Sequence, residues 1–169
     1  MKRLVILASG NGSLAQAIFD ASLDVDIVAV ISDQKDAAVL ERAHKARLET
    51  FTIPMLPDRT QWDRELETLI AALKPDLVVS AGFMRILSER ITSRFKIINS
   101  HPALLPLFPG AHAVRDALAA GATETGTTIH WVDAGVDTGK VIAQERVEIR
   151  PEDTEESLHE RIKIVERGL

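Results

Sequence analysis

The stretch Leu4-Val5-Ile6-Leu7-Ala8-Ser9-Gly10-Asn11-Gly12-Ser13 joins a short apolar run to a glycine-rich turn. A continuously apolar run of this length is typical of a strand that is buried on both faces of a parallel sheet. Leu14, Ile18 and Phe19 follow at helical spacing, so a helix is expected directly after the turn. A strand, a glycine turn and a helix in this order are typical of the start of an α/β fold with a ligand site at the turn.

The same alternation continues along the chain. Helical patterns separate further Val- and Ile-rich runs, and the expected strands are Leu4–Ala8, Ile27–Ile31, Leu77–Ala81, Ile97–Asn99, Thr127–Val132 and, as an edge strand, Val141–Val147. The pattern predicts a single-domain, Rossmann-like α/β fold, with helices on both faces of a mostly parallel sheet. A chain of 169 residues with 46% hydrophobic content suits one domain over residues 1–169.

Composition narrows the classes of function. The chain has no cysteine, which excludes disulfides, thiolate metal sites and a cysteine nucleophile. A net charge of -5 gives no general attraction for nucleic acid, and no apolar run is long enough for a membrane span. The composition leaves the compartment undetermined but is compatible with the cytoplasm, which is the location we expect. We expect no nucleic-acid or membrane partners, so local donors must hold any anionic ligand.

The glycine turn favours a phosphate but does not identify the ligand. We expect Ser13 to cap the helix with Gln16 as its reciprocal partner, and the glycines to let an anion approach the backbone. Gly10, Gly12 and Ala15 also match the dinucleotide pattern GxGxxA, and Asp33 follows the second strand where a ribose-binding acid would lie. A nicotinamide-dinucleotide-binding protein is therefore an open alternative.

A second motif lies in the proline-rich segment Asn99–Gly110. Asn99 and His101 stand two residues apart at the end of an expected strand, so both side chains can point to the same side. An amide that hydrogen-bonds an oxyanion and an imidazole that moves a proton together suit acyl transfer. The residues alone leave open a purely structural role, in which both side chains only hold the loop.

The loop that follows the fifth expected strand contains two aspartates. Asp133 and Asp137 are both candidates for a carboxylate beside His101, and both could instead stabilise turns. His112 and His130 match no dense metal-ligand spacing, so no metal site is expected, and His130 is expected to be a packing or supporting residue.

The segment NxHPxLLPxxxG, Asn99–Gly110, resembles the core signature of the folate-dependent formyltransferases and hydrolases. Three further segments agree. Residues 133–140 are similar to the family's DxGxDTGP loop with Lys140 in place of its proline, residues 9–13 to its ribonucleotide phosphate loop, and Ala81–Leu87 to its folate-pocket segment. Leu14 stands where the family commonly has asparagine, and the family usually continues past the helix that ends at Leu169.

The resemblance implies roles for individual residues. It implies a catalytic group of Asn99, His101 and Asp137. It implies ribonucleotide contacts from Gly12, Ser13, Leu14 and Glu166, and folate contacts from Arg59, Met84, Arg85, Ile86, Leu87 and Asn99. It also implies a cis peptide at Leu105-Pro106.

The implied activity is formyl transfer from 10-formyltetrahydrofolate, as co-substrate, to the amine of glycinamide ribonucleotide in de novo purine biosynthesis. The amine would attack directly, without metal, in a monomer or homodimer. The alternatives are hydrolysis of 10-formyltetrahydrofolate, in which water replaces the amine, and the dinucleotide-binding protein.

Overall fold

The computed structural model describes residues 1–168 and contains two compact units, Met1–Ile98 and a second that begins at Asn99. Leu169, the last residue of the predicted domain, lies outside the described residues. The elements in chain order are β1 (Lys2–Leu7), α1 (Ser13–Asp20), β2 (Val25–Ser32), α2 (Ala38–Lys45), β3 (Thr50–Thr52), α3 (Arg59–Leu73), β4 (Leu77–Ser80), α4 (Glu89–Arg94), β5 (Ile97–His101), α5 (Ala113–Ala119), β6 (Glu124–Trp131), β7 (Val141–Glu148) and α6 (Glu155–Gly168).

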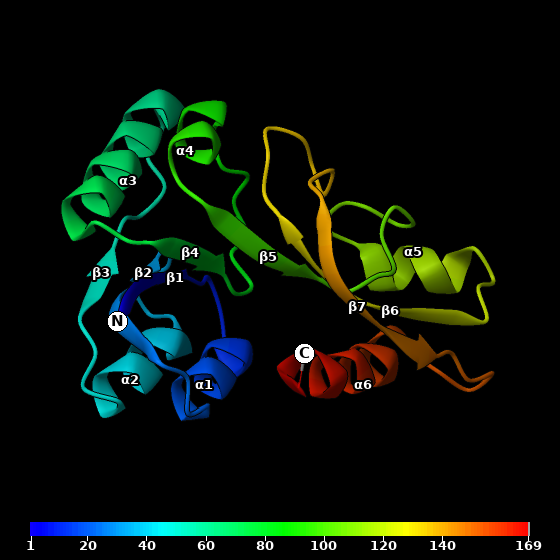
Figure 1. Ribbon diagram of the computed structural model, residues 1–169. Helices are drawn as coiled ribbons and strands as arrows, with labels where there is room; N and C mark the ends of the chain where they lie inside the picture. Colours follow the sequence, from blue (N-terminus) through cyan, green and yellow to red (C-terminus); the bar gives the residue numbers. More distant parts are fainter. Residues whose placement is uncertain (169) are drawn as a thin grey trace. The chain divides into compact units, whose positions relative to one another are not determined.

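The strands follow the order β3-β2-β1-β4-β5-β6-β7 (Figure 1). β1 pairs in parallel with β2 and β4, β2 pairs in parallel with β3, and β6 pairs antiparallel with β7. The predicted class, α/β with a mostly parallel sheet, is confirmed, and β7 is the edge strand that the alternating pattern predicts. The predicted cis peptide at Leu105-Pro106 is also confirmed.

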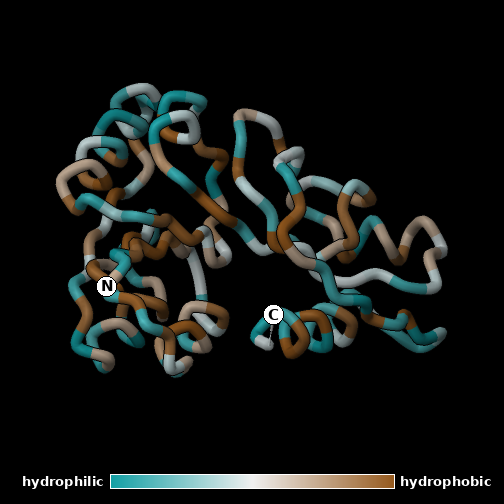
Figure 2. The backbone as a smooth tube through the Cα atoms, in the orientation of Figure 1, coloured by the Kyte–Doolittle hydropathy of each residue, from teal (hydrophilic) through white to brown (hydrophobic). Residues whose placement is uncertain are grey.

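The core of the first unit explains why its strands are continuously apolar. Figure 1 shows α1 and α2 on one side of these strands and α3 and α4 on the other, and Figure 2 shows hydrophobic residues along the strands. Ile6 and Val30 pack with Val39 of α2, whereas α3 buries Trp62 on its own inner face. Each fully buried side chain of this size contributes about 1.5–3 kcal/mol to the hydrophobic stabilisation.

The second unit is smaller and has a core of its own. α6 buries Leu158 and Ile162, which pack with Val114 of α5 and Val147 of β7. The strand β5 begins at Ile97 and supplies Asn99, Ser100 and His101 to this unit. The unit therefore places three polar side chains in succession at the carboxyl end of a strand, where open α/β sheets bind ligands.

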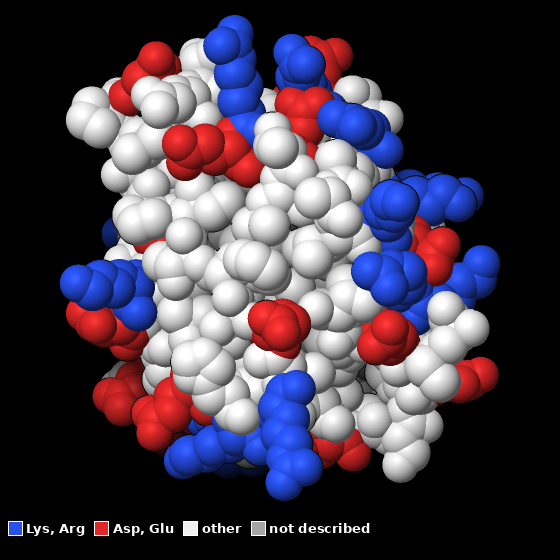
Figure 3. Space-filling model, turned by 90° about the vertical axis from the view of Figure 1, so that its left-hand side faces the viewer, with Lys and Arg blue, Asp and Glu red and all other residues white. Residues whose placement is uncertain are grey.

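Charged side chains are mixed on the surface. On the face that Figure 3 shows, Lys and Arg lie next to Asp and Glu, and no continuous basic patch covers that face. Among the helices of residues 1–168, none combines the length and the apolar character that crossing a bilayer requires.

Candidate active site

The glycine turn leads directly into the first residue of α1. Gly12 occupies the N-cap position in the left-handed region, with φ of +81°, and its carbonyl accepts the backbone amide of Gln16 at 2.8 Å. The predicted cap by Ser13 is wrong, because the helix begins at Ser13 itself, and the Gln16 side chain bonds to Asp20 instead. The amides of the first helical turn have no partner within the helix, so those of Ser13 and Leu14 remain donors for an anion.

Asp33 directly follows β2 but does not offer its carboxylate to a ribose. Its side chain is fully buried, and its Oδ2 accepts a hydrogen bond from Nε of Arg85 at 2.7 Å. A ribose-binding acid must be open to the ligand's hydroxyl groups. Asp33 is therefore not placed to act as the ribose-binding acid that the dinucleotide alternative requires.

The predicted folate segment is held in the first unit by side chains from other elements. The Met84 amide donates to Oγ of Ser9 at 2.8 Å, and the Arg59 guanidinium donates to the carbonyl of Ile86. Met84 and Ile86 are 68% and 62% exposed, whereas Leu87 is buried. The backbone of the segment is thus held in place, and two of its apolar side chains are exposed to solvent and do not belong to the hydrophobic core.

The polar residues of the second unit gather around one carboxylate. Oδ2 of Asp137 lies 3.4 Å from Nδ1 of His101, and Oδ1 lies 3.5 Å from Nε2 of His130. The amide nitrogen of Asn99 lies 3.3 Å from the same nitrogen of His130, and Nε2 of His101 lies 2.8 Å from the carbonyl oxygen of Phe108. The structure therefore brings Asn99, His101 and Asp137 together, with His130 between the amide and the carboxylate.

The loop after β6 separates the roles of its two aspartates. Asp133 accepts hydrogen bonds from the Gly135 amide at 2.9 Å and the Thr138 hydroxyl at 2.6 Å, which is a turn-forming arrangement. Asp137 adopts a left-handed φ of +56° and accepts the amide of Gly110 at 2.8 Å. Asp133 stabilises its own turn, whereas Asp137 faces the histidines.

Burial and charge act in opposite directions on this cluster. Burial raises the pKa of Asp137, but hydrogen bonds from His130 and Gly110 and the nearby His101 outweigh it, so the pKa lies below its ordinary value. Burial lowers the pKa of His130, but Asp137 and the carbonyl of Trp131 outweigh that effect and raise it. Asp137 is therefore ionised near neutral pH, and each of its two carboxylate oxygens faces one imidazole ring.

Glu166 of α6 belongs to the same unit but has different partners. Its Oε2 accepts a hydrogen bond from the Ser100 hydroxyl at 2.6 Å and a longer one from Thr127 at 3.5 Å. Ser100 lies between Asn99 and His101 on β5, and alternate strand residues point to opposite sides. β5 thus directs its amide and imidazole to one group of partners and its hydroxyl to Glu166.

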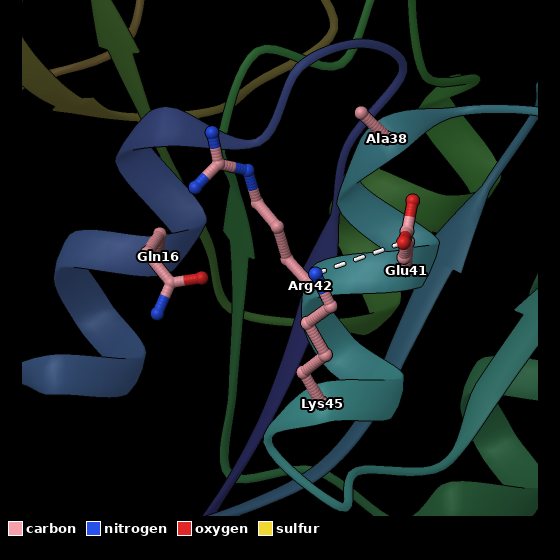
Figure 4. Close-up of a pocket in the computed structure, with 5 residues that line it drawn as sticks. All are labelled: Gln16, Ala38, Glu41, Arg42 and Lys45. Atoms are coloured by element: carbon pink, nitrogen blue, oxygen red, sulfur yellow. Dashed lines mark ion pairs between the residues drawn. The ribbon is translucent and has the colours of Figure 1, made fainter.

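Within residues 1–168, no three His, Asp or Glu side chains gather in a group that could hold a metal ion. A cavity of about 340 Å³ lies between α1 and α2 (Figure 4), lined by Gln16, Ala38, Glu41, Arg42 and Lys45. None of the predicted site residues lines that cavity.

Comparison with known proteins places the chain among enzymes of one kind. Residues 2–169 match the family model described as "Formyl transferase". A phosphoribosylglycinamide formyltransferase of Mycobacterium tuberculosis is 50% identical, over 99% of this chain and 80% of the relative, and one of Escherichia coli is 41% identical, over 98% and 82%. The solved glycinamide ribonucleotide transformylase 1 from Symbiobacterium toebii has a TM-score of 0.96 at 39% identity, covering 100% of this chain and 84% of its own.

Proposed function

The chain belongs to the formyl transferase family, and we propose that it transfers the formyl group of 10-formyltetrahydrofolate to the amine of glycinamide ribonucleotide in purine biosynthesis. The observation that carries the proposal is the cluster in which His101 faces the Asp137 carboxylate, while Asn99 contacts His130, which faces the same carboxylate. The names of relatives such as the 50%-identical formyltransferase support the same substrate. We place the reaction in the cytoplasm, with the ribonucleotide and the folate as its small-molecule partners.

The first step is attack of the substrate amine on the formyl carbon, which forms a C–N bond and leaves a negative oxygen. Asn99 is the donor for that oxygen. Its amide nitrogen carries two hydrogens, either of which can be donated to the developing charge. A preorganised donor of this kind contributes about a hundredfold or more to turnover.

His101 moves the proton that the amine loses to the nitrogen of the departing folate. A carbonyl oxygen only accepts, so Nε2 of His101 carries the hydrogen that bonds to Phe108. Nδ1 is then the position that gains and loses a proton, and the Asp137 carboxylate beside it balances the charge of the imidazolium. The C–N bond to the folate breaks as that proton is delivered, and no covalent enzyme intermediate forms.

The remaining site residues bind the two substrates. The backbone amides of Gly12, Ser13 and Leu14 hold the phosphate of the ribonucleotide at the helix start, and Glu166 accepts hydrogen bonds from its ribose. The folate ring lies against the exposed Met84 and Ile86 and is hydrogen-bonded by the backbone of the segment through Leu87. Arg59 and Arg85 act there by fixing that segment.

An assay of folate product tests the proposal directly. The protein is incubated with 10-formyltetrahydrofolate, with and without glycinamide ribonucleotide. Turnover that requires the ribonucleotide is expected. Equal turnover without it would identify a hydrolase, and protection against heating by NAD or NADP but not by the ribonucleotide would favour the dinucleotide alternative.

A further inference from the structure

The glycine turn is held by α2 as well as by α1. The amide of Val39, in the first turn of α2, donates to the carbonyl of Gly10 at 3.1 Å. Gly12 faces the same residue so closely that an added Cβ would lie 2.8 Å from Cα of Val39. Asn11, between the two glycines, contacts Arg42, which is one helical turn after Val39 and on the same face. Each residue of the turn from Gly10 to Gly12 therefore faces or contacts α2.

Arg42 makes the strongest of these contacts. Its Nε donates to the backbone carbonyl of Asn11 at 2.8 Å, and its Nη2 donates to the side-chain Oδ1 of Asn11 at 2.9 Å. A planar guanidinium can make both bonds at once, and charged donors strengthen each of them. In Figure 4, Arg42 extends from α2 toward α1, whereas Lys45 stays beside its own helix and pairs with Glu41 at 3.7 Å.

We infer that Arg42 is a positioning residue for anion binding: it fixes Asn11 so that the amides of Gly12, Ser13 and Leu14 converge on the phosphate of the ribonucleotide. The inference rests on the proposed function for the identity of that ligand. A glycine-rich turn has a wide choice of backbone conformations, and binding must otherwise restrict them. Ordering the turn in advance removes that cost from the binding step.

The chain offers a matched set of variants. Arg42→Ala removes both bonds, and Arg42→Lys keeps the positive charge but loses the planar fork. Lys45→Ala is the control, because Lys45 is a cation on the same helix and lines the same cavity but pairs with Glu41. Amide chemical shifts of Gly12, Ser13 and Leu14 are followed by NMR as inorganic phosphate, and separately glycinamide ribonucleotide, is added.

We expect Arg42→Ala and Arg42→Lys both to weaken binding about tenfold, the equivalent of one charge-assisted hydrogen bond, and Lys45→Ala to leave it unchanged. In steady-state assays, KM for the ribonucleotide should rise by a similar factor, while kcat and KM for the formyl donor stay within about twofold. Full recovery of binding in Arg42→Lys would overturn the inference, because charge and not geometry would then be what Arg42 supplies.

The two proposals can fail separately. In one outcome, phosphate shifts the amide signals of the turn, both Arg42 variants weaken that binding, and the protein shows no turnover that depends on the ribonucleotide. This outcome would support the positioning role and refute the proposed function. Normal turnover with unchanged ribonucleotide binding in Arg42→Ala would refute the positioning role alone. Absence of any phosphate-induced shift at Gly12, Ser13 and Leu14 in the unmodified protein would also overturn the inference.

Discussion

Replacing Gly12 by alanine tests the tight packing at the glycine turn. The new Cβ would lie 2.6 Å from Cβ and Cγ2 of Val39 and 2.8 Å from its Cα, so the α2 backbone itself would have to move. Overpacking of this kind costs about 1–3 kcal/mol. The left-handed φ of +81° adds a further cost of roughly 1–2 kcal/mol for a residue with a Cβ. The unfolding free energy should therefore fall by about 2–5 kcal/mol.

Gly10→Ala is the matched control, because a Cβ at Gly10 meets nothing within 4 Å and its φ lies outside the left-handed region. We expect it to change the unfolding free energy by less than about 1 kcal/mol, as for an ordinary surface substitution. Urea denaturation of both variants, with circular dichroism as the signal, measures the difference. Equal stability of Gly12→Ala and Gly10→Ala would refute the argument that Val39 and the backbone conformation together require glycine at position 12.

The other predictions concern the polar cluster and the folate segment. Asn99→Ala should lower kcat about a hundredfold, the scale of one lost oxyanion donor, in steady-state assays; a loss below about threefold would remove Asn99 from that role. Asp137→Asn should lower the pKa of His130 in an NMR titration, because burial then acts without the opposing carboxylate, and an unchanged pKa would contradict that cause. The depressed pKa of Asp137 stabilises the fold above the carboxyl's unfolded pKa, a contribution lost as pH falls through the folded value, so Asp137→Asn should flatten the acid limb of stability against pH. Asp33→Asn removes the charge that pairs with Arg85, so KM for the formyl donor should rise more than KM for the ribonucleotide. A KM for the formyl donor equal to that of the unmodified protein would show that the ion pair with Asp33 is not needed to hold Arg85.

Local patterns predicted much of the fold. The apolar runs marked five of the six predicted strands as buried, since two-sided burial leaves little room for polar residues. β3, Thr50–Thr52, was not predicted because three residues form no recognisable run. The Ser13 cap failed because a left-handed glycine can end the turn without a side-chain cap, and residue types alone do not reveal that conformation.

The site was predictable where its residues lie close together in the sequence. Asn99 and His101 stand two apart on one strand, so their common direction followed from strand geometry. The choice of Asp137 over Asp133 needed the family resemblance, because both stand in one loop and only the folded backbone separates them. His130 was expected only as a packing or supporting residue. Its place between Asn99 and Asp137 could not be predicted, because it stands on β6, apart in the sequence from both β5 and the loop that carries Asp137.

The destination of the formyl carbon tests the central claim most directly. 10-Formyltetrahydrofolate labelled with ¹³C at the formyl group is incubated with the protein and glycinamide ribonucleotide, and the products are identified by mass spectrometry and ¹³C NMR. The account predicts that the label appears on the amine of the ribonucleotide at the rate at which tetrahydrofolate forms. Label that appears only in free formate, at a rate independent of the ribonucleotide, would contradict it.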